Sequence, residues 1–175
     1  MELNKVYFFT ATIHHWIPIF EQEGYKEVLL SSLRFLTGKG LLKVYGFVIM
    51  PNHIHLIWEL LEMNGKELPH ASFMKFTSHE FLKKMRSGNT ELLRHFVVDQ
   101  GIRAHLFWQR DSLPIEVHSP KVVFQKLDYI HRNPCKGKWM LAENPLLYPY
   151  SSYEFYETGE DRFGFLTHVG IARRL

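Results

Sequence analysis

The spacing of hydrophobic residues divides most of the chain into short strand-like runs and longer helix-like segments. Apolar residues recur every three or four positions in two stretches, which predicts helices at residues 18–37 and 70–86. Elsewhere they alternate with polar residues or form short β-branched and aromatic runs, which predicts strands at 5–14, 42–50, 53–61 and within 105–117. The resulting order is strand, helix, strand, strand, helix, strand.

This order is typical of an α+β fold, and we predict a ferredoxin-like (RRM-like) antiparallel sheet with helices packed against it. A further helix is expected after the last strand, because Ser119 and Pro120 suit its N-cap and first turn, and Pro134 ends it. The predicted fold is therefore a ferredoxin-like sheet with an added C-terminal helix. No linker or repeat divides the chain, so residues 1–175 are predicted to form a single domain.

The predicted strand 53–61 carries two histidines on one side. Side chains alternate across a strand, so His53 and His55 point the same way, roughly 7 Å apart. Imidazole is the commonest metal-binding side chain, so this His-x-His pair is a candidate metal site. A polar, exposed strand face is an equally simple explanation of the pair alone. The opposite side of the strand is uniformly apolar and is predicted to be the core face: Ile54, Leu56, Trp58 and Leu60.

The helix that begins at Pro120 has an apolar stripe and a polar face. The stripe is predicted to pack inward and consists of Val123, Leu127 and Ile130. Tyr129 and Asn133 are four residues apart, so they lie one above the other, on nearly the opposite face. A tyrosine kept for packing is more typical of the apolar stripe, so this position favours a functional role. An ordinary amphipathic helix with a surface tyrosine is the alternative.

Considered together, these segments resemble those of the HUH single-tyrosine transposases, small enzymes of insertion sequences that move as single-stranded DNA. The most similar branch is the REP-associated tyrosine transposases. The Met-Pro-Asn-His-Ile-His and Tyr-Ile-His-x-Asn-Pro motifs are specific in combination and in this order. The resemblance covers most of the chain, through the segments Val6–Ile13, Tyr45–His55, Phe107–Arg110 (an expected strand), Tyr129–Pro134 and Tyr150–Tyr153.

The resemblance implies that His53 and His55 are ligands of the HUH metal ion and that Tyr129 is the nucleophile. Asn133 matches the position, one turn after the tyrosine, where relatives carry a third polar ligand. The resemblance also implies cleavage near DNA hairpins, a 5′-phosphotyrosine intermediate and a free 3′-hydroxyl. Residues 135–139 are more basic than the small apolar run of many relatives, which leaves the packing of the tail and its DNA contacts open.

The chemistry of phosphodiester cleavage favours a divalent metal ion, Mg²⁺ or Mn²⁺. The charge of a phosphodiester repels nucleophiles, and a hard cation offsets this by polarising a non-bridging oxygen. Such ions accept oxygen ligands and retain water, so two imidazoles, an amide oxygen and the phosphate form an acceptable shell. Few tyrosine hydroxyls are ionised at neutral pH, so a nucleophilic tyrosine needs a nearby cation or base. The chain has no glycine-rich phosphate loop, which fits a reaction without ATP.

Charge in this chain is local rather than global. The formal net charge is +3 over 175 residues, so the chain is no polycationic DNA binder. Basic residues gather beside the tyrosine and along the helix 70–86. Each cluster could contact DNA phosphates, and the alternative for each is an ordinary solvent-exposed helix face. We predict DNA contacts at Lys75, Arg110, Lys126, Arg132, Lys136 and Lys138.

Cysteine usage and hydropathy indicate the compartment. Cys135 is the single cysteine, which excludes an internal disulfide, argues against a cysteine-ligated zinc site and fits a reducing environment. No apolar run is long enough to span a bilayer and the N-terminus lacks a signal-peptide pattern, so we expect a cytoplasmic protein.

The function predicted from the sequence is that of a transposase acting on single-stranded DNA. Three alternatives remain: a catalytically silent hairpin-binding protein of the same fold, a relaxase-like nickase, and a metal-dependent phosphodiesterase for small nucleotides that would not need Tyr129. The sequence leaves the oligomeric state open, because relatives include monomers as well as dimers in which the tyrosine helix serves the partner's site. The aromatic residues of the tail after residue 140 are expected mainly to pack.

Overall fold

The computed structural model describes residues 1–100, 103–110 and 112–171. Four strands form the main antiparallel sheet in the spatial order β2-β3-β1-β6. Their bounds are Val6–Thr12 (β1), Leu42–Met50 (β2), His53–Leu60 (β3) and Leu113–Glu116 (β6). The order and the antiparallel pairing confirm the expected ferredoxin-like plan.

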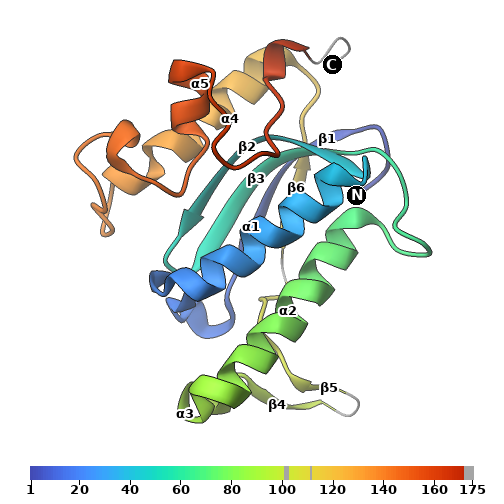
Figure 1. Cartoon of the computed structure of the whole chain (residues 1–175), viewed down its shortest axis with the longest axis vertical. Helices are drawn as coiled ribbons and strands as arrows, with labels where there is room; N and C mark the ends of the chain where they lie inside the picture. The colour runs from blue at the N-terminus through green and yellow to red at the C-terminus, as the bar shows by residue number, and fades with distance from the viewer. Residues whose placement is uncertain (101–102, 111, 172–175) are drawn as a thin grey trace.

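Helices cover both faces of this sheet, as Figure 1 shows. Helices α1 (Glu23–Gly38) and α2 (Pro69–Gly88) pack side by side against one face. Helix α4 (Pro120–Arg132), the expected added helix, lies across the other face together with the short α5 (Tyr153–Thr158). The Ser119 hydroxyl accepts a hydrogen bond from the Val122 amide, as expected for the N-cap of α4.

The sequence pattern left residues 87–104 unassigned; of these, the described residues 87–100 and 103–104 lie beyond the sheet, at the far end of α2 (Figure 1). They form the short helix α3 (Thr90–Arg94) and a separate hairpin of β4 (Val97–Gln100) and β5 (Arg103–His105). The prediction of a strand at Phe107–Arg110 is wrong: only Trp108 pairs, as an isolated bridge to Ile13. Phe107 and Trp108 instead turn their rings into the core beside Phe81.

The first helix begins later than the predicted residue 18. Two short 3-10 turns, His14–Trp16 and Ile19–Glu21, come between β1 and α1. Further 3-10 turns occupy Asn133–Cys135, Pro145–Leu147 and Val169–Ile171. Within the described ranges, every helix is too short or too polar to cross a lipid bilayer.

The chain after α4 returns to the sheet and pairs with the free edge of β2. The Ile49 amide donates to the Tyr150 carbonyl (2.9 Å), and the Ser152 and Thr167 amides donate to the carbonyls of Phe47 and Val44. This covers a strand edge that would otherwise present unpaired backbone groups. The tail aromatics pack as expected: the Tyr148 and Tyr156 hydroxyls donate to the carbonyls of Ile49 and Tyr45, both at 2.6 Å.

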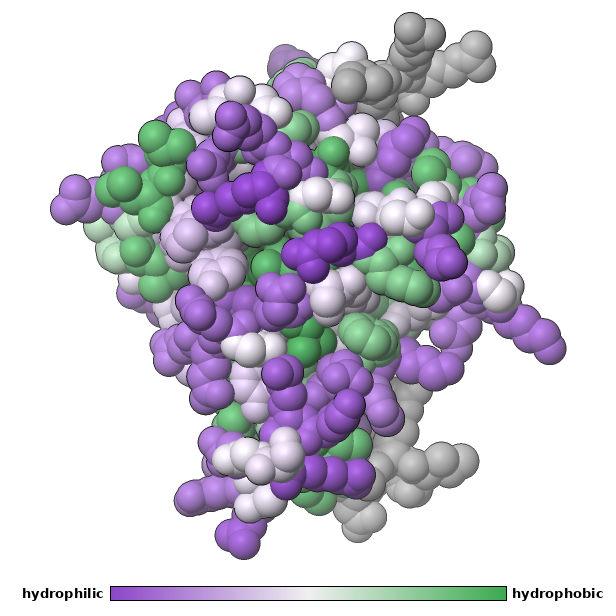
Figure 2. Space-filling view, in the orientation of Figure 1, coloured by the Kyte–Doolittle hydropathy of each residue, from purple (hydrophilic) through white to green (hydrophobic). Residues whose placement is uncertain are grey.

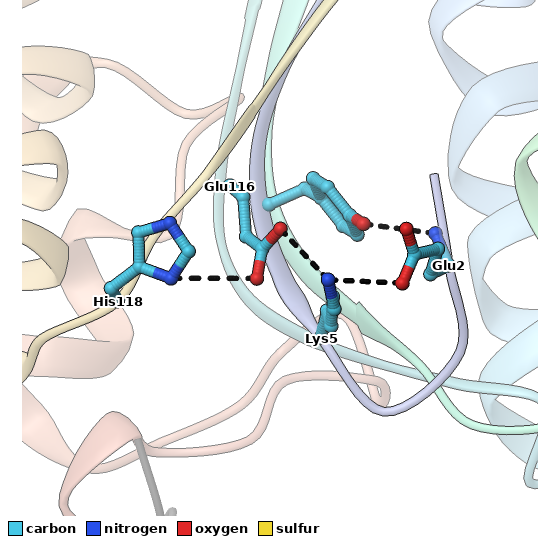
Figure 3. A network of polar contacts seen from close by, with 5 residues as sticks. Glu2, Lys5, Glu116 and His118 are labelled. Atoms are coloured by element: carbon cyan, nitrogen blue, oxygen red, sulfur yellow. Dashed lines mark hydrogen bonds and ion pairs between the residues drawn. The ribbon is translucent and has the colours of Figure 1, made fainter.

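The other edge of the sheet is joined by a polar network. Lys5 Nζ, just before β1, lies 2.9 Å from Glu2 Oε2 and 3.1 Å from Glu116 Oε2 at the end of β6. His118 Nδ1 lies 3.4 Å from the other oxygen of Glu116 (Figure 3). The network therefore connects the central strand β1 to the short edge strand β6.

Both faces of the sheet are buried, which corrects the expectation that only the Ile54–Leu60 side of β3 is a core face. A large aromatic and aliphatic core lies under α1 and α2, and a smaller one lies under α4. The stripe predicted on α4 belongs to this second core: Val123, Leu127 and Ile130 are all buried. Helix α4 approaches β2 closely at Gly46, where an added Cβ would overlap Leu127 Cδ2.

The surface in the orientation of Figure 2 is mostly hydrophilic, with small separate hydrophobic patches. One patch lies at the left, over the segment that follows α4 (Figures 1 and 2). This segment carries the exposed side chains of Met140, Leu141, Leu146 and Leu147.

Candidate active site

Each of the two histidines of β3 has a hydrogen-bond partner at its Nδ1 atom. His55 Nδ1 lies 2.7 Å from the Thr10 hydroxyl, which faces it from β1 in the strand register. His53 Nδ1 lies 2.7 Å from Asn52 Oδ1, and the Asn52 amide nitrogen donates to the Trp16 carbonyl at 3.0 Å. An occupied Nδ1 fixes the orientation of each ring and leaves Nε2 for a ligand, which is the usual second-shell arrangement of metal-binding histidines.

Burial keeps both imidazoles neutral. It lowers the pKa of His53 to about 4, with a further contribution from the charge of Lys138. It lowers the pKa of His55 to about 3, assisted by His53 and the charge of Lys126. The ring centroids are 4.8 Å apart, in an edge-to-face arrangement. A metal ion binds neutral imidazole, so the pair is in the correct protonation state over the physiological pH range.

Tyr129 lies beside this pair in the same chain. Its ring centroid is 5.5 Å from that of His55 and 6.0 Å from that of Phe8, edge-on in both contacts. The side chain is still 51% exposed, so the phenol is within reach of a large substrate. The prediction that Tyr129 lies nearly opposite the packing stripe is therefore wrong: the residue lies at the margin of the packed face, which brings it to the histidines.

Two lysines, Lys126 and Lys138, lie close enough to the site for their charges to act on the histidines. Lys126 Nζ lies 4.6 Å from the centroid of the Phe8 ring and 6.0 Å from that of Tyr129. Phe8 in turn stacks on His55 at 5.4 Å. Lys138 Nζ lies 4.9 Å from the centroid of the Trp139 ring. The charges of these lysines oppose protonation of the histidines and favour a bound anion.

The donor set fits a divalent ion that keeps open positions. No group of three or more histidine, cysteine, aspartate or glutamate side chains gathers anywhere in the described ranges. The protein ligands on offer are thus the two imidazoles and, as the predicted third, the amide of Asn133. Asn133 is half-buried, caps the C-terminus of α4 and follows Tyr129 by one turn. Two or three protein ligands leave room for substrate oxygens and water.

The other predicted DNA contacts lie apart from the histidines. Lys75 is on α2, which packs on the opposite face of the sheet, and its Nζ pairs with Glu67 at 2.8 Å. Arg132 Nε pairs with Asp128 at 2.6 Å. Arg132 and Lys136 line a polar cavity of about 520 Å³ beside α4, together with Tyr153. Arg110 is exposed and lies near His14, whose pKa is lowered by burial and, to a smaller extent, by His15 and the charge of Arg110.

His131, next but one to Tyr129, is a structural residue. It is 6% exposed, its Nε2 lies 2.8 Å from the Ser152 hydroxyl, and burial lowers its pKa to about 4. Ser152 also accepts from the Phe47 amide at 3.0 Å. This contact therefore ties the tyrosine helix to the tail and to β2.

Sequence reasoning missed three residues that support the site: Phe8, Thr10 and Asn52. Phe8 and Thr10 approach His55 from β1, and only the strand register reveals this, because Thr10 stands opposite His55. The sequence could have pointed to Asn52, since it directly precedes His53 in the Met-Pro-Asn-His-Ile-His motif. Its burial (2% exposed) marks it as a structural partner of that histidine.

Comparison with known proteins identifies the fold. No protein-family model matches the chain, and no curated protein sequence matches it. Among solved structures, it is similar to a REP-associated tyrosine transposase bound to a REP hairpin, with a TM-score of 0.61 and 18% sequence identity. The match covers 96% of this chain and 88% of that one. The chain therefore has the fold of a REP-associated tyrosine transposase, in agreement with the resemblance of its His-x-His and tyrosine motifs to the HUH family.

Proposed function

We propose that this protein is a transposase: a metal-dependent endonuclease and strand transferase that cleaves single-stranded DNA near hairpins through a phosphotyrosine on Tyr129. The observation that carries this proposal is the position of the Tyr129 ring, 5.5 Å from His55 and edge-on to it within one chain. The fold shared with a hairpin-bound REP transposase supports the same class of substrate.

His53 and His55 would hold Mg²⁺ or Mn²⁺, with Asn133 as the third protein ligand. The ion would polarise a non-bridging oxygen of the scissile phosphate. Thr10 and Asn52 keep the two imidazole rings in a fixed orientation through their Nδ1 atoms. A fixed ligand set costs less reorganisation when the substrate arrives.

Tyr129 supplies the nucleophile. Its Oη would attack phosphorus, so that the Oη–P bond forms and the P–O3′ bond breaks. The 3′ oxygen leaves as a hydroxyl after taking up a proton, and the phenol loses one. Attack on the phosphotyrosine by the 3′-hydroxyl of another strand would reverse the step and transfer the DNA. The Lys126 ammonium, 6.0 Å from the centre of the Tyr129 ring, would stabilise the negative charge of the scissile phosphate.

Tyr129 and the histidines belong to the same chain, which supports cleavage by a monomer rather than by a helix exchanged with a partner. Among the predicted DNA contacts, Lys126 and Lys138 would hold the phosphates near the cleaved bond, which their charge effects on His55 and His53 support. Lys75 pairs with Glu67 on the other face of the sheet, so a role in DNA binding there would be separate from cleavage.

The test is covalent capture of DNA. The protein is incubated with labelled hairpin oligonucleotides from the DNA flanking its gene, with Mn²⁺ or with EDTA, and then denatured. A protein–DNA band that requires both metal and the Tyr129 hydroxyl is expected. Tyr129→Phe should remove it, whereas Tyr153→Phe, which removes a phenol on the far side of α4 beside His131, should not.

Three outcomes contradict the proposal in different ways. Hairpin binding without any band would indicate a silent DNA-binding protein of this fold. A band that persists in Tyr129→Phe would mean that another residue is the nucleophile. Metal-dependent hydrolysis of small nucleotides by Tyr129→Phe at the wild-type rate would indicate a phosphodiesterase.

A further inference from the structure

The turn His14–Trp16, which follows β1, presents an unusually exposed indole. Trp16 is 59% exposed, although tryptophan is normally among the more buried residues. His15 beside it is exposed as well, and its ring centroid lies 3.9 Å from that of His14. The turn therefore offers solvent a cluster of aromatic rings outside the two cores.

The backbone of this turn is held in a strained conformation. His15 (φ 57°) and Trp16 (φ 58°) are both left-handed, and neither is glycine. Each such residue costs roughly 1–2 kcal/mol. Two consecutive residues of this kind persist only where their surroundings hold them, and such strain clusters at functional sites.

Asn52 holds the turn and also holds the first histidine of the candidate active site. Its amide nitrogen donates to the Trp16 carbonyl at 3.0 Å, while its Oδ1 lies 2.7 Å from His53 Nδ1. The Ile13 amide donates to the Asn52 carbonyl at 2.8 Å, which fixes the start of the turn to the same residue. One buried side chain thus places the Trp16 backbone two hydrogen bonds away from the His53 ring.

The chemistry around the indole fits an unpaired nucleotide. An exposed indole offers a flat face on which any base can stack. Arg110 lies near His14, and its guanidinium suits a phosphate. A cation whose charge reaches this turn favours a polyanionic strand over an apolar protein surface, so nucleic acid is the favoured partner.

We infer that Trp16 is a base-stacking site for an unpaired nucleotide of the DNA strand, next to the phosphodiester held at His53. This inference rests on the proposed function for the identity of the ligand, but not for its test. The stacking site would fix the strand at the turn after β1, on the Asn52 side of His53. It would require the base to be unpaired, because a base inside a duplex has no free face.

Binding is tested without cleavage, in the Tyr129→Phe background. The probes are a single-stranded oligothymidylate and an abasic oligonucleotide of equal length, which keeps the phosphates and lacks the bases. Trp16→Ala should weaken oligothymidylate binding by about five- to a hundredfold, the range that stacking of one base is worth. It should leave binding of the abasic strand unchanged. Trp16→Phe keeps an aromatic face and should retain most of the affinity.

The matched control is Phe35→Ala, which removes an aromatic ring of similar exposure (55%) from α1, on the other face of the sheet. It should bind both probes like the parent. Trp16 is exposed, so Trp16→Ala should melt at the parent temperature, and a change in binding then reports on the contact rather than on folding.

The inference is overturned if Trp16→Ala binds oligothymidylate like Phe35→Ala, or loses affinity equally for both probes. It is also overturned if the parent binds no oligothymidylate, which would leave the indole to a protein partner. The covalent-capture assay separates this from the proposed function. If binding depends on Trp16 but the protein with Tyr129 intact forms no phosphotyrosine band, only the cleavage reaction is refuted. If Trp16→Ala forms the covalent product at the full rate at subsaturating DNA, only the stacking site is refuted.

Discussion

The two faces of the β2-β3-β1-β6 sheet are both buried, but they are built differently. The face under α1 and α2 is a dense layer of large rings and aliphatic side chains, among them Trp58, Phe73, Phe81 and Trp108. The face under α4 has a smaller apolar layer, and its margin carries His53, His55 and Tyr129.

The α4 face tolerates polar side chains because each has a partner. His55 pairs with Thr10, His131 with Ser152, and the Tyr45 hydroxyl donates to Glu59 at 2.5 Å. Burying such groups without hydrogen bonds would cost about 1–3 kcal/mol each. The densely packed face therefore stabilises the sheet, and this allows the other face to hold neutral imidazoles at its margin.

The largest expected effect comes from a change at the α4 face. His55→Gln should reduce formation of the covalent product by on the order of a thousandfold or more, because it removes a metal ligand worth several kcal/mol in the transition state. Mn²⁺ binding, followed by calorimetry, should weaken in parallel. His79→Gln, an exposed histidine on α2, is the matched control and should change neither quantity. Normal Mn²⁺ binding by His55→Gln would refute the metal site.

Next in size is a change at the other face, which should affect stability and not chemistry. Phe81 is fully buried and contacts the rings of Phe20, Tyr25 and Trp108. Phe81→Ala should lower the free energy of unfolding by about 3–5 kcal/mol, measured by urea denaturation. Phe124→Ala, at an exposed position of α4, should change it by less than about 0.5 kcal/mol. Equal losses of unfolding free energy in the two variants would contradict the assignment of Phe81 to the core and Phe124 to the surface.

Lowering the pH should reduce the free energy of unfolding through protonation of His131 on the α4 face. Its pKa is lowered from 6.5 to about 4 in the folded protein, so between these values the unfolded chain binds more protons. Stability is therefore complete above pH 6.5 and declines as the pH falls towards 4, by up to about 3 kcal/mol for this residue. His131→Asn cannot titrate there and should show a shallower decline in urea denaturation with EDTA present. An unchanged slope would contradict the prediction.

The close approach of α4 to β2 predicts a smaller effect. Gly46→Ala places a methyl group against Leu127 and should destabilise the protein by about 1–3 kcal/mol through overpacking. In a Leu127→Ala background the same change should cost less, because space is then available. Thermal melts of the four proteins measure this coupling, and simple additivity would show that the two side chains do not compete.

The smallest effect is expected at the edge network of Lys5 and Glu116. These side chains are partly exposed, so Glu116→Gln should change the free energy of unfolding by no more than about 1 kcal/mol, and less at high salt. A loss of several kcal/mol would mean that β6 depends on this ion pair rather than on its backbone pairing with β1.

The prediction from sequence succeeded where the signal is local. The apolar run of β2 and the alternation in β3 placed both strands almost to the residue, and Ser119 and Pro134 bounded α4. It failed where a segment takes its shape from distant contacts. Phe107–Arg110 reads as a strand, but its rings are drawn into the core under α2. Likewise, the histidine side of β3 read as exposed, because nothing in β3 itself indicates that α4 covers it.

Local sequence patterns are enough to predict the order of the elements, the two imidazoles on one side of β3 and a tyrosine followed one turn later by an asparagine on α4. These follow from the fixed repeats of strand and helix, which act over a few residues. Three relations emerge only in the folded chain: Tyr129 reaches His55, Thr10 and Asn52 orient the two rings, and the tail covers the β2 edge. Those relations depend on strand register and on how α4 docks, and both are set by packing between residues far apart in the chain.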